Sequence, residues 1–129
     1  PDRMSKRERP LSPHLQVYRL EYTMALSGGH RISGMALAAA FIALVGCLGA
    51  LAAGPECYGV VAGWLGSIWG KLLFSAAVTG FWYHFTTGLR HLRWDAGIGF
   101  ERAEARRSAV VAVVAIVVLS GLSIWAIFA

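Results

Sequence analysis

Apolar residues along this chain come in long blocks rather than in spaced stripes. Three stretches contain no Asp, Glu, Lys or Arg: residues 32–55, 72–89 and 108–129. Each reaches the roughly 18 residues that mark a membrane-crossing helix, because about 20 residues cross a bilayer core of about 30 Å. A soluble protein's buried helix could imitate one such block, but hardly three in 129 residues. The pattern predicts an all-α integral membrane protein with three transmembrane helices, over about residues 27–54, 64–90 and 108–128.

The residues before the first apolar block differ in composition from the rest of the chain. Residues 1–22 are polar and basic, and Pro10 and Pro13 interrupt them, so we expect an arm that does not cross the membrane. Residues 23–129 would then form the three-helix transmembrane domain. Within it, the charged segment after Asp95 has the spacing of an amphipathic surface helix.

Basic residues concentrate in alternate connections between the apolar blocks. They gather before the first block and between the second and third, whereas the first connection has Glu56 and no basic residue until Lys71. By the positive-inside rule, the N-terminus faces the inside and the C-terminus the outside. The net charge of +5 is thereby explained by topology, and no nucleic-acid partner is predicted.

Polar and ionisable residues inside a membrane are costly and are usually functional. Here they form two groups, one near the start of the first span and one near the end of the second: Ser27, His30 and Arg31, and then His84, Arg90 and His91. The predicted topology places both groups on the inner side of the bilayer. Antiparallel neighbouring helices would therefore bring them into one layer, as a shared site requires.

The second group has an informative helical phase. His84, Gly88 and His91 lie four and seven residues apart and share a face, which Ala77 and Gly80 extend. Small residues beside an imidazole leave the flat space that an axial histidine ligand of haem needs.

Basic side chains near this imidazole suit the propionates of a haem. His91, Arg90 and Arg31 lie closer to the inner surface and could hold propionates by charge-assisted hydrogen bonds. The alternative is an imidazole hydrogen-bonded within a glycine-packed helix interface. These residues alone leave both interpretations open.

The first group has the chemistry of a quinone site. Ser27 and Arg31 lie four residues apart on one helical face, with His30 alongside. A hydroxyl and a guanidinium could bind the carbonyl oxygens of a quinone that enters from the lipid. In the alternative, Ser27 caps the helix N-terminus and Arg31 contacts a headgroup phosphate.

Two motifs resemble the signatures of a known family. The first is RPLSPHL at residues 9–15 followed by SxxHRxSG at residues 27–34, and the second is HxxxGLRHLxWDxG at residues 84–97. In this order and on these spans, they resemble the cytochrome b membrane-anchor subunit of succinate dehydrogenase, over about residues 9–128. One departure is Glu21-Tyr22, where relatives usually carry an apolar residue or proline, and it leaves the path of the arm open.

The resemblance implies partners and an activity. Such subunits pair with a second small anchor subunit in a heterodimeric helical bundle, which seats an iron–sulfur subunit and a flavoprotein subunit on the inner face. Electrons from succinate pass through flavin and iron–sulfur clusters to ubiquinone, and haem b lies between the two anchors with one axial histidine from each. The chain would thus be a subunit of succinate:quinone oxidoreductase without a succinate site of its own.

The resemblance also implies a role for individual residues. His84 corresponds to the axial ligand of the haem iron, and Ser27 and Arg31 correspond to quinone-site residues. His30, Arg31 and His91 correspond to neighbours of the haem propionates. The implied location is the bacterial cytoplasmic membrane, with the mitochondrial inner membrane as the alternative.

Three other functions compete with this interpretation. A fumarate reductase anchor would use the same architecture in the opposite direction, and a structural anchor would have lost its haem, against which the retained His84 argues. A small transporter would need a polar stripe through its spans, and the third block has no ionisable residue.

Overall fold

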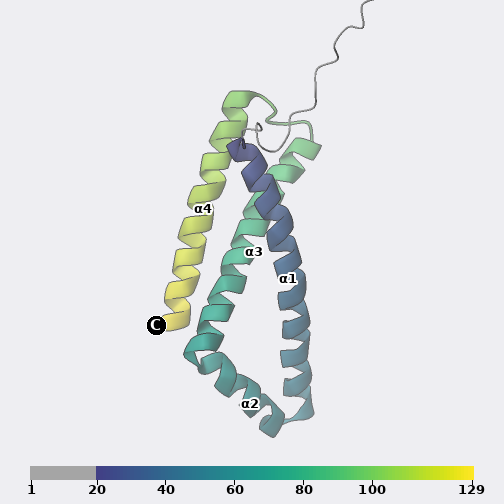
Figure 1. The fold of residues 1–129 in the computed structure, drawn as a ribbon, viewed down its shortest axis with the longest axis vertical. Coiled ribbons are helices and arrows are strands. Elements are labelled where there is room, and N and C mark those ends of the chain that lie inside the picture. Colours follow the sequence, from purple (N-terminus) through teal and green to yellow (C-terminus); the bar gives the residue numbers. More distant parts are fainter. Residues whose placement is uncertain (1–19) are drawn as a thin grey trace, which may run out of the picture.

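The computed structural model describes residues 20–129, which form four helices and no strand (Figure 1). They are α1 (Tyr22–Ala53), α2 (Pro55–Gly66), α3 (Ile68–Asp95) and α4 (Arg102–Phe128). Most of the predicted basic arm and the RPLSPHL motif lie outside the described residues.

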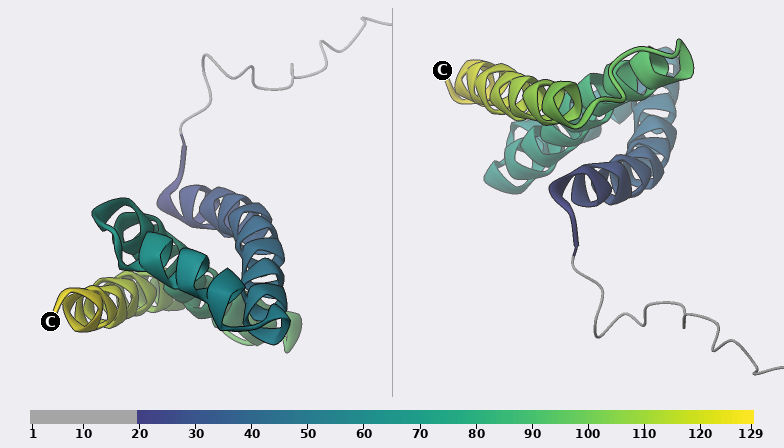
Figure 2. Two further views of the ribbon diagram at one scale, coloured as in Figure 1. Left: turned by 90° about the horizontal axis from the view of Figure 1, so that it is seen from below. Right: turned by 90° about the horizontal axis from the view of Figure 1, so that it is seen from above.

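The three long helices lie side by side with α3 in the middle. α3 contacts both α1 and α4, whereas α1 and α4 barely touch each other, and Figure 2 shows them on different sides of α3. α1 begins at the end of the bundle where α3 ends and α4 begins, and we call this the arginine-rich end (Figure 1). From there α1 and α3 diverge, and α2 bridges the gap between their far ends.

The length and apolarity of the helices fit a membrane protein. α1 and α4 are each long and apolar enough to cross a bilayer, and α2 with α3 meets the same criterion only as a bent pair. α3 carries Lys71, His84 and Arg90, which lower its mean hydropathy below that of the other two long helices. The predicted all-α membrane architecture is therefore confirmed, with the middle span as its most polar member.

The segment before the middle span differs from the expectation of a continuous helix from about residue 64. α2 and α3 meet at Ser67 with a bend of 78°. The Ser67 hydroxyl donates to the Trp64 carbonyl at 2.6 Å and accepts from the Gly70 amide at 3.2 Å, so one side chain ends α2 and caps α3. Hydropathy cannot detect this break, because apolar residues flank Ser67 on both sides.

Two helices extend beyond the apolar blocks. α1 starts at Tyr22, ahead of the expected residue 27, and α4 starts at Arg102, so the predicted surface helix continues directly into the third span. Hydropathy marks only the part of a helix that suits hydrocarbon, whereas backbone hydrogen bonds continue the helix into the polar interface.

Packing between the helices relies on small and hydroxyl-bearing residues. The buried side chains are mainly Ser33, Ser75, Thr87, Ala109, Ala112 and Ser120, whereas most large apolar side chains face outwards. This is the arrangement expected where lipid or a partner helix covers the outside, because small residues let helix backbones approach closely.

Candidate functional site

α1 and α3 bring three histidines together near the arginine-rich end. The imidazoles of His30 and His84 stack with their centroids 3.9 Å apart, and the His91 ring lies 4.9 Å from that of His30. The two groups that the sequence separates by more than fifty residues thus form one cluster, as the antiparallel arrangement predicted.

Hydrogen bonds select one tautomer of the His84 ring. Its Nδ1 lies 3.0 Å from the His30 carbonyl oxygen and 3.3 Å from the Ser33 hydroxyl. A carbonyl oxygen can only accept, so Nδ1 carries the proton and donates it. In the tautomer that this bond selects, the lone pair is on Nε2, which forms no hydrogen bond within residues 20–129. A metal-binding histidine is oriented in the same way, with its other nitrogen donating to a carbonyl.

A second chain of hydrogen bonds orients His30. The Thr87 hydroxyl donates to the Tyr83 carbonyl at 2.6 Å, and its oxygen lies 2.9 Å from His30 Nδ1. Since that hydroxyl has given its hydrogen to the carbonyl, His30 Nδ1 is the donor of the second bond. Thr87 is only 1% exposed, so these bonds are shielded from water.

Glycines make room for both rings. A Cβ at Gly34 would lie 3.0 Å from His84 Cε1, and a Cβ at Gly88 would lie 3.4 Å from His30 Cε1. The stripe of small residues predicted to leave space beside His84 is thus partly filled, because the His30 ring packs at Gly88. At Gly80 on the same helix, nothing lies within 4 Å of an added Cβ, so that part of the stripe stays open.

A close contact between α1 and α3 lies beside the cluster. The Tyr83 hydroxyl donates to the Leu26 carbonyl at 3.2 Å, and a Cβ at Gly29 would collide with the Tyr83 ring and hydroxyl. Thr87, Tyr83 and Gly29 were not predicted from the sequence. The only available signal was the spacing of four between Tyr83 and Thr87, which places both on the face of α3 near His84 and Gly88.

Ser27 and Arg31 lie on α1 next to the cluster. Ser27 is half-buried and Arg31 is exposed, and neither side chain bonds to another side chain within the part of the chain that the structure describes. α1 begins at Tyr22 with Glu21 at its N-cap, so Ser27 is already inside the helix. The alternative role of Ser27 as a helix cap is therefore wrong.

Arg90 faces away from the histidines, contrary to its suggested role beside a haem propionate. Its Nε donates to the Ser108 hydroxyl and its Nη2 to the Ala105 carbonyl, both at 3.1 Å. The guanidinium also lies over the Trp94 ring, 4.0 Å from its centroid. The phase of α3 turns residue 90 towards α4, so Arg90 joins these two helices.

These features define a class: a small helical membrane protein with a histidine cluster held between two spans near one end. Over residues 5–123 the chain matches the family described as the succinate dehydrogenase/fumarate reductase transmembrane subunit. The chain belongs to this family, and the resemblance found in its motifs is confirmed.

Curated relatives agree over most of the chain. It is 37% identical to the succinate dehydrogenase cytochrome b556 subunit of Paracoccus denitrificans, over 97% of this chain and 96% of that protein. It is 39% identical to the mitochondrial succinate dehydrogenase cytochrome b560 subunit of Mus musculus, over 88% of this chain and 68% of the relative. A cytochrome b556 subunit from Rickettsia felis is 37% identical over 72% of each chain. The predicted membrane location is therefore confirmed, with relatives in bacteria and in mitochondria.

Proposed function

We propose that this chain is a cytochrome b membrane anchor of succinate dehydrogenase that binds haem b and forms part of a ubiquinone-reduction site. Membership of the family supports the anchor role, and the names of the relatives support both the cytochrome and the direction of turnover. Fumarate reductase anchors share the family, but the relatives from Paracoccus denitrificans, Mus musculus and Rickettsia felis are named as subunits of succinate dehydrogenases.

The observation that carries the haem assignment is the hydrogen bonding of His84. Its Nδ1 donates to the His30 carbonyl, which leaves the Nε2 lone pair for an iron atom. The half-buried position also suits a ligand that must stay out of bulk water. The residues present therefore fit a haem, with His84 as the axial ligand from this chain.

The second axial ligand is expected from another chain. The His30 ring is nearly parallel to that of His84 and only 3.9 Å away, so the two rings cannot lie on opposite faces of one porphyrin. A second anchor subunit with its own histidine would complete the site.

When bound, haem b supplies a one-electron redox centre within the membrane. His30, His91 and Arg31 would serve its propionates. The rings of His84 and His91 both lie against that of His30. For Arg31, whose side chain is exposed on α1, the support is its position in the SxxHRxSG motif. Donors from these three residues would stabilise carboxylates at the edge of the porphyrin.

Ser27 and Arg31 would bind ubiquinone. They lie one turn apart on α1, and neither forms a hydrogen bond or ion pair with another side chain within residues 20–129. The Ser27 hydroxyl would donate to a quinone carbonyl, and the Arg31 guanidinium would stabilise negative charge that develops on that oxygen. Arg31 would then serve the quinone and a propionate together.

The partners follow from the predicted orientation. With the N-terminus inside, the arginine-rich end faces the inner side, where the iron–sulfur and flavoprotein subunits would dock. The outward-facing apolar side chains of α1 would contact lipid or the second anchor subunit.

A reduced-minus-oxidised visible spectrum of the complex purified through this chain tests the proposal. We expect a b-type α band, and we expect succinate to reduce the flavin and iron–sulfur clusters that co-purify. Co-purifying dehydrogenase subunits without a haem band would instead identify a haem-free structural anchor. A complex that oxidises quinol with fumarate faster than it reduces quinone with succinate would favour the fumarate reductase alternative.

A further inference from the structure

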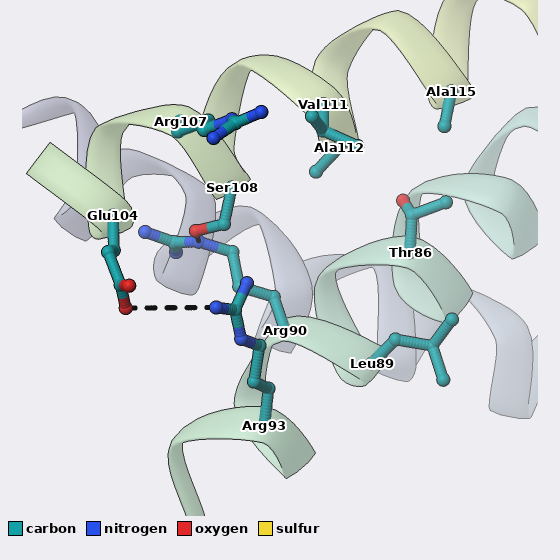
Figure 3. Close-up of a pocket in the computed structure, with 10 residues that line it drawn as sticks. All are labelled: Thr86, Leu89, Arg90, Arg93, Glu104, Arg107, Ser108, Val111, Ala112 and Ala115. Carbon is teal, nitrogen blue, oxygen red and sulfur yellow. Dashed lines mark hydrogen bonds and ion pairs between the residues drawn. The ribbon is translucent and has the colours of Figure 1, made fainter. Parts of the chain in front are cut away.

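A second candidate site lies between α3 and α4, on the side of α3 away from α1. It is a hollow of about 520 Å³ near the arginine-rich end (Figure 3). The end of this hollow at the membrane surface is charged, with Arg93, Glu104 and Arg107, and its other end is apolar, with Leu89, Val111 and Ala115. The close-up shows these two kinds of side chain at opposite ends of the hollow.

The wall of this groove holds a buried cation, Arg90, with no anionic partner among residues 20–129. Arg90 is 5% exposed, and its hydrogen bonds go to the neutral Ser108 hydroxyl and Ala105 carbonyl. No carboxylate within residues 20–129 pairs with it. A buried guanidinium is costly unless an anion compensates its charge. The groove therefore favours an anionic ligand.

The other charged side chains of the groove also favour an anionic ligand. The one carboxylate in the lining, Glu104, lies 3.7 Å from Arg93, and both of these side chains are about half exposed. Arg107 has no carboxylate partner among the described residues. The lining thus contains three guanidinium groups and one carboxylate, which leaves net positive charge at this end of the groove.

The order of charge and apolarity along the groove matches one class of ligand. A free phosphate would use only the charged end, and a hydrocarbon would use only the apolar end. A phospholipid uses both, since its phosphate lies at the membrane surface and its acyl chains run inwards along the helices. Fixed arginines at the surface end favour an anionic headgroup over one that also carries an amine.

We propose that this groove binds an anionic phospholipid from the leaflet at the arginine-rich end. The phosphate lies between Arg93 and Arg107 and compensates the charge of Arg90, and one acyl chain follows Val111 and Ala115. The lipid fills the space between α3 and α4 and so stabilises their pairing. This role is independent of the haem and quinone sites, which lie on the α1 side of α3.

The test uses the membrane complex purified in detergent through this chain and supplied with phosphatidylglycerol or phosphatidylethanolamine. Mass spectrometry of the intact complex then counts the phospholipid that each variant retains. The variants are Arg107→Gln, which removes a lining cation, and Arg106→Gln, a matched control at a neighbouring exposed residue outside the lining. Glu104→Gln removes the competing carboxylate.

We expect the parent complex to retain phosphatidylglycerol in preference to phosphatidylethanolamine. Arg107→Gln should weaken retention about tenfold, because it removes charge-assisted hydrogen bonds to the phosphate. Arg106→Gln should leave retention unchanged, and Glu104→Gln should strengthen it. The haem spectrum of each variant checks that the fold is intact.

Three outcomes would overturn the proposal. Equal losses in Arg106→Gln and Arg107→Gln would mean a diffuse surface charge rather than a built site. Equal retention of both lipids would remove the role of the anionic headgroup. Crosslinking of an Arg107→Cys variant to a dehydrogenase subunit, with no lipid retained by the parent complex, would assign the groove to a protein partner.

Discussion

The imidazoles of His30 and His84 lie face to face, 3.9 Å apart and within 10° of parallel. The backbone of His30 also accepts a hydrogen bond from the His84 ring. The packing of α1 against α3 and the geometry of the candidate iron ligand therefore depend on the same atoms. Substitutions among the residues around His30 and His84 are expected to affect haem binding and the pairing of α1 with α3 to different degrees. The haem spectrum and the denaturation temperature measure these two effects separately.

His84→Ala should remove the haem or strongly perturb it, because the iron loses the axial nitrogen that this chain provides. The measurement is the b-type α band in the purified complex. His91→Ala is the comparison, since it changes a predicted propionate neighbour and should shift the redox potential while the haem stays bound. An unchanged spectrum in His84→Ala would refute the ligand assignment.

Thr87→Val tests the hydrogen bonds that orient His30. Valine has nearly the shape of threonine, so the change mainly removes the oxygen that lies 2.9 Å from His30 Nδ1. The buried donor is then left without its partner, and we expect a loss of about 1–2 kcal/mol in stability. Thermal denaturation of the complex measures this effect.

Thr86→Val is the matched control for that experiment. Thr86 donates to the carbonyls of Trp82 and Tyr83 and does not contact the histidines through its hydroxyl. It should lower the denaturation temperature less than Thr87→Val does. If Thr86→Val destabilises the complex as much as Thr87→Val, the assigned role of Thr87 is wrong.

The layer of histidines could be predicted from the sequence, but the contacts within it could not. Long apolar blocks and alternating basic connections predict that His30 and His84 lie at one depth in the membrane. This prediction is robust because both signals are averages over many residues. The stacking of the two rings depends on the rotation of α1 against α3. That rotation is set by single contacts, such as those of Tyr83 and Gly29, which leave no periodic signal in the sequence.

The direction of the Arg90 side chain also could not be predicted from the sequence. Its place beside His91 in the sequence made it a candidate partner for a haem propionate, yet it turns to the Ala105 carbonyl on α4. Adjacent residues in a helix point about 100° apart, so closeness in sequence does not mean a shared site. The break at Ser67 was missed for a related reason, since hydropathy does not register a single capping hydroxyl.

Gly29→Ala should weaken the pairing of α1 with α3. The added methyl group would collide with the Tyr83 side chain, whose hydroxyl binds the Leu26 carbonyl, so one of the two helices must shift. Overpacking of this kind typically costs about 1–3 kcal/mol. We expect a lower denaturation temperature of the complex.

Gly28→Ala provides the control, because nothing lies within 4 Å of a Cβ added at that position. It should be neutral or slightly stabilising, since alanine favours a helix by up to about 1 kcal/mol over glycine. Equal destabilisation by both variants would mean that Tyr83 does not define this contact.

Ser27→Ala should slow ubiquinone reduction while succinate still reduces an artificial dye at the normal rate. The variant loses a donor to the quinone carbonyl, and loss of one donor to an oxygen that gains negative charge can lower turnover by roughly 100- to 1,000-fold. Ser27→Thr keeps the hydroxyl and should retain most of the activity. An equal loss of quinone and dye activity in Ser27→Ala would instead indicate a defect in assembly.

Arg31→Leu should impair quinone turnover and change the haem potential together, because one guanidinium is proposed to serve both ligands. Loss of the positive charge removes the stabilisation of developing charge on the quinone oxygen and weakens the hold on a propionate. Arg31→Lys separates charge from geometry, since lysine keeps the charge but cannot form two parallel hydrogen bonds. If Arg31→Leu slows quinone reduction without moving the potential, Arg31 belongs to the quinone site alone, and His30 and His91 remain as the propionate partners from this chain.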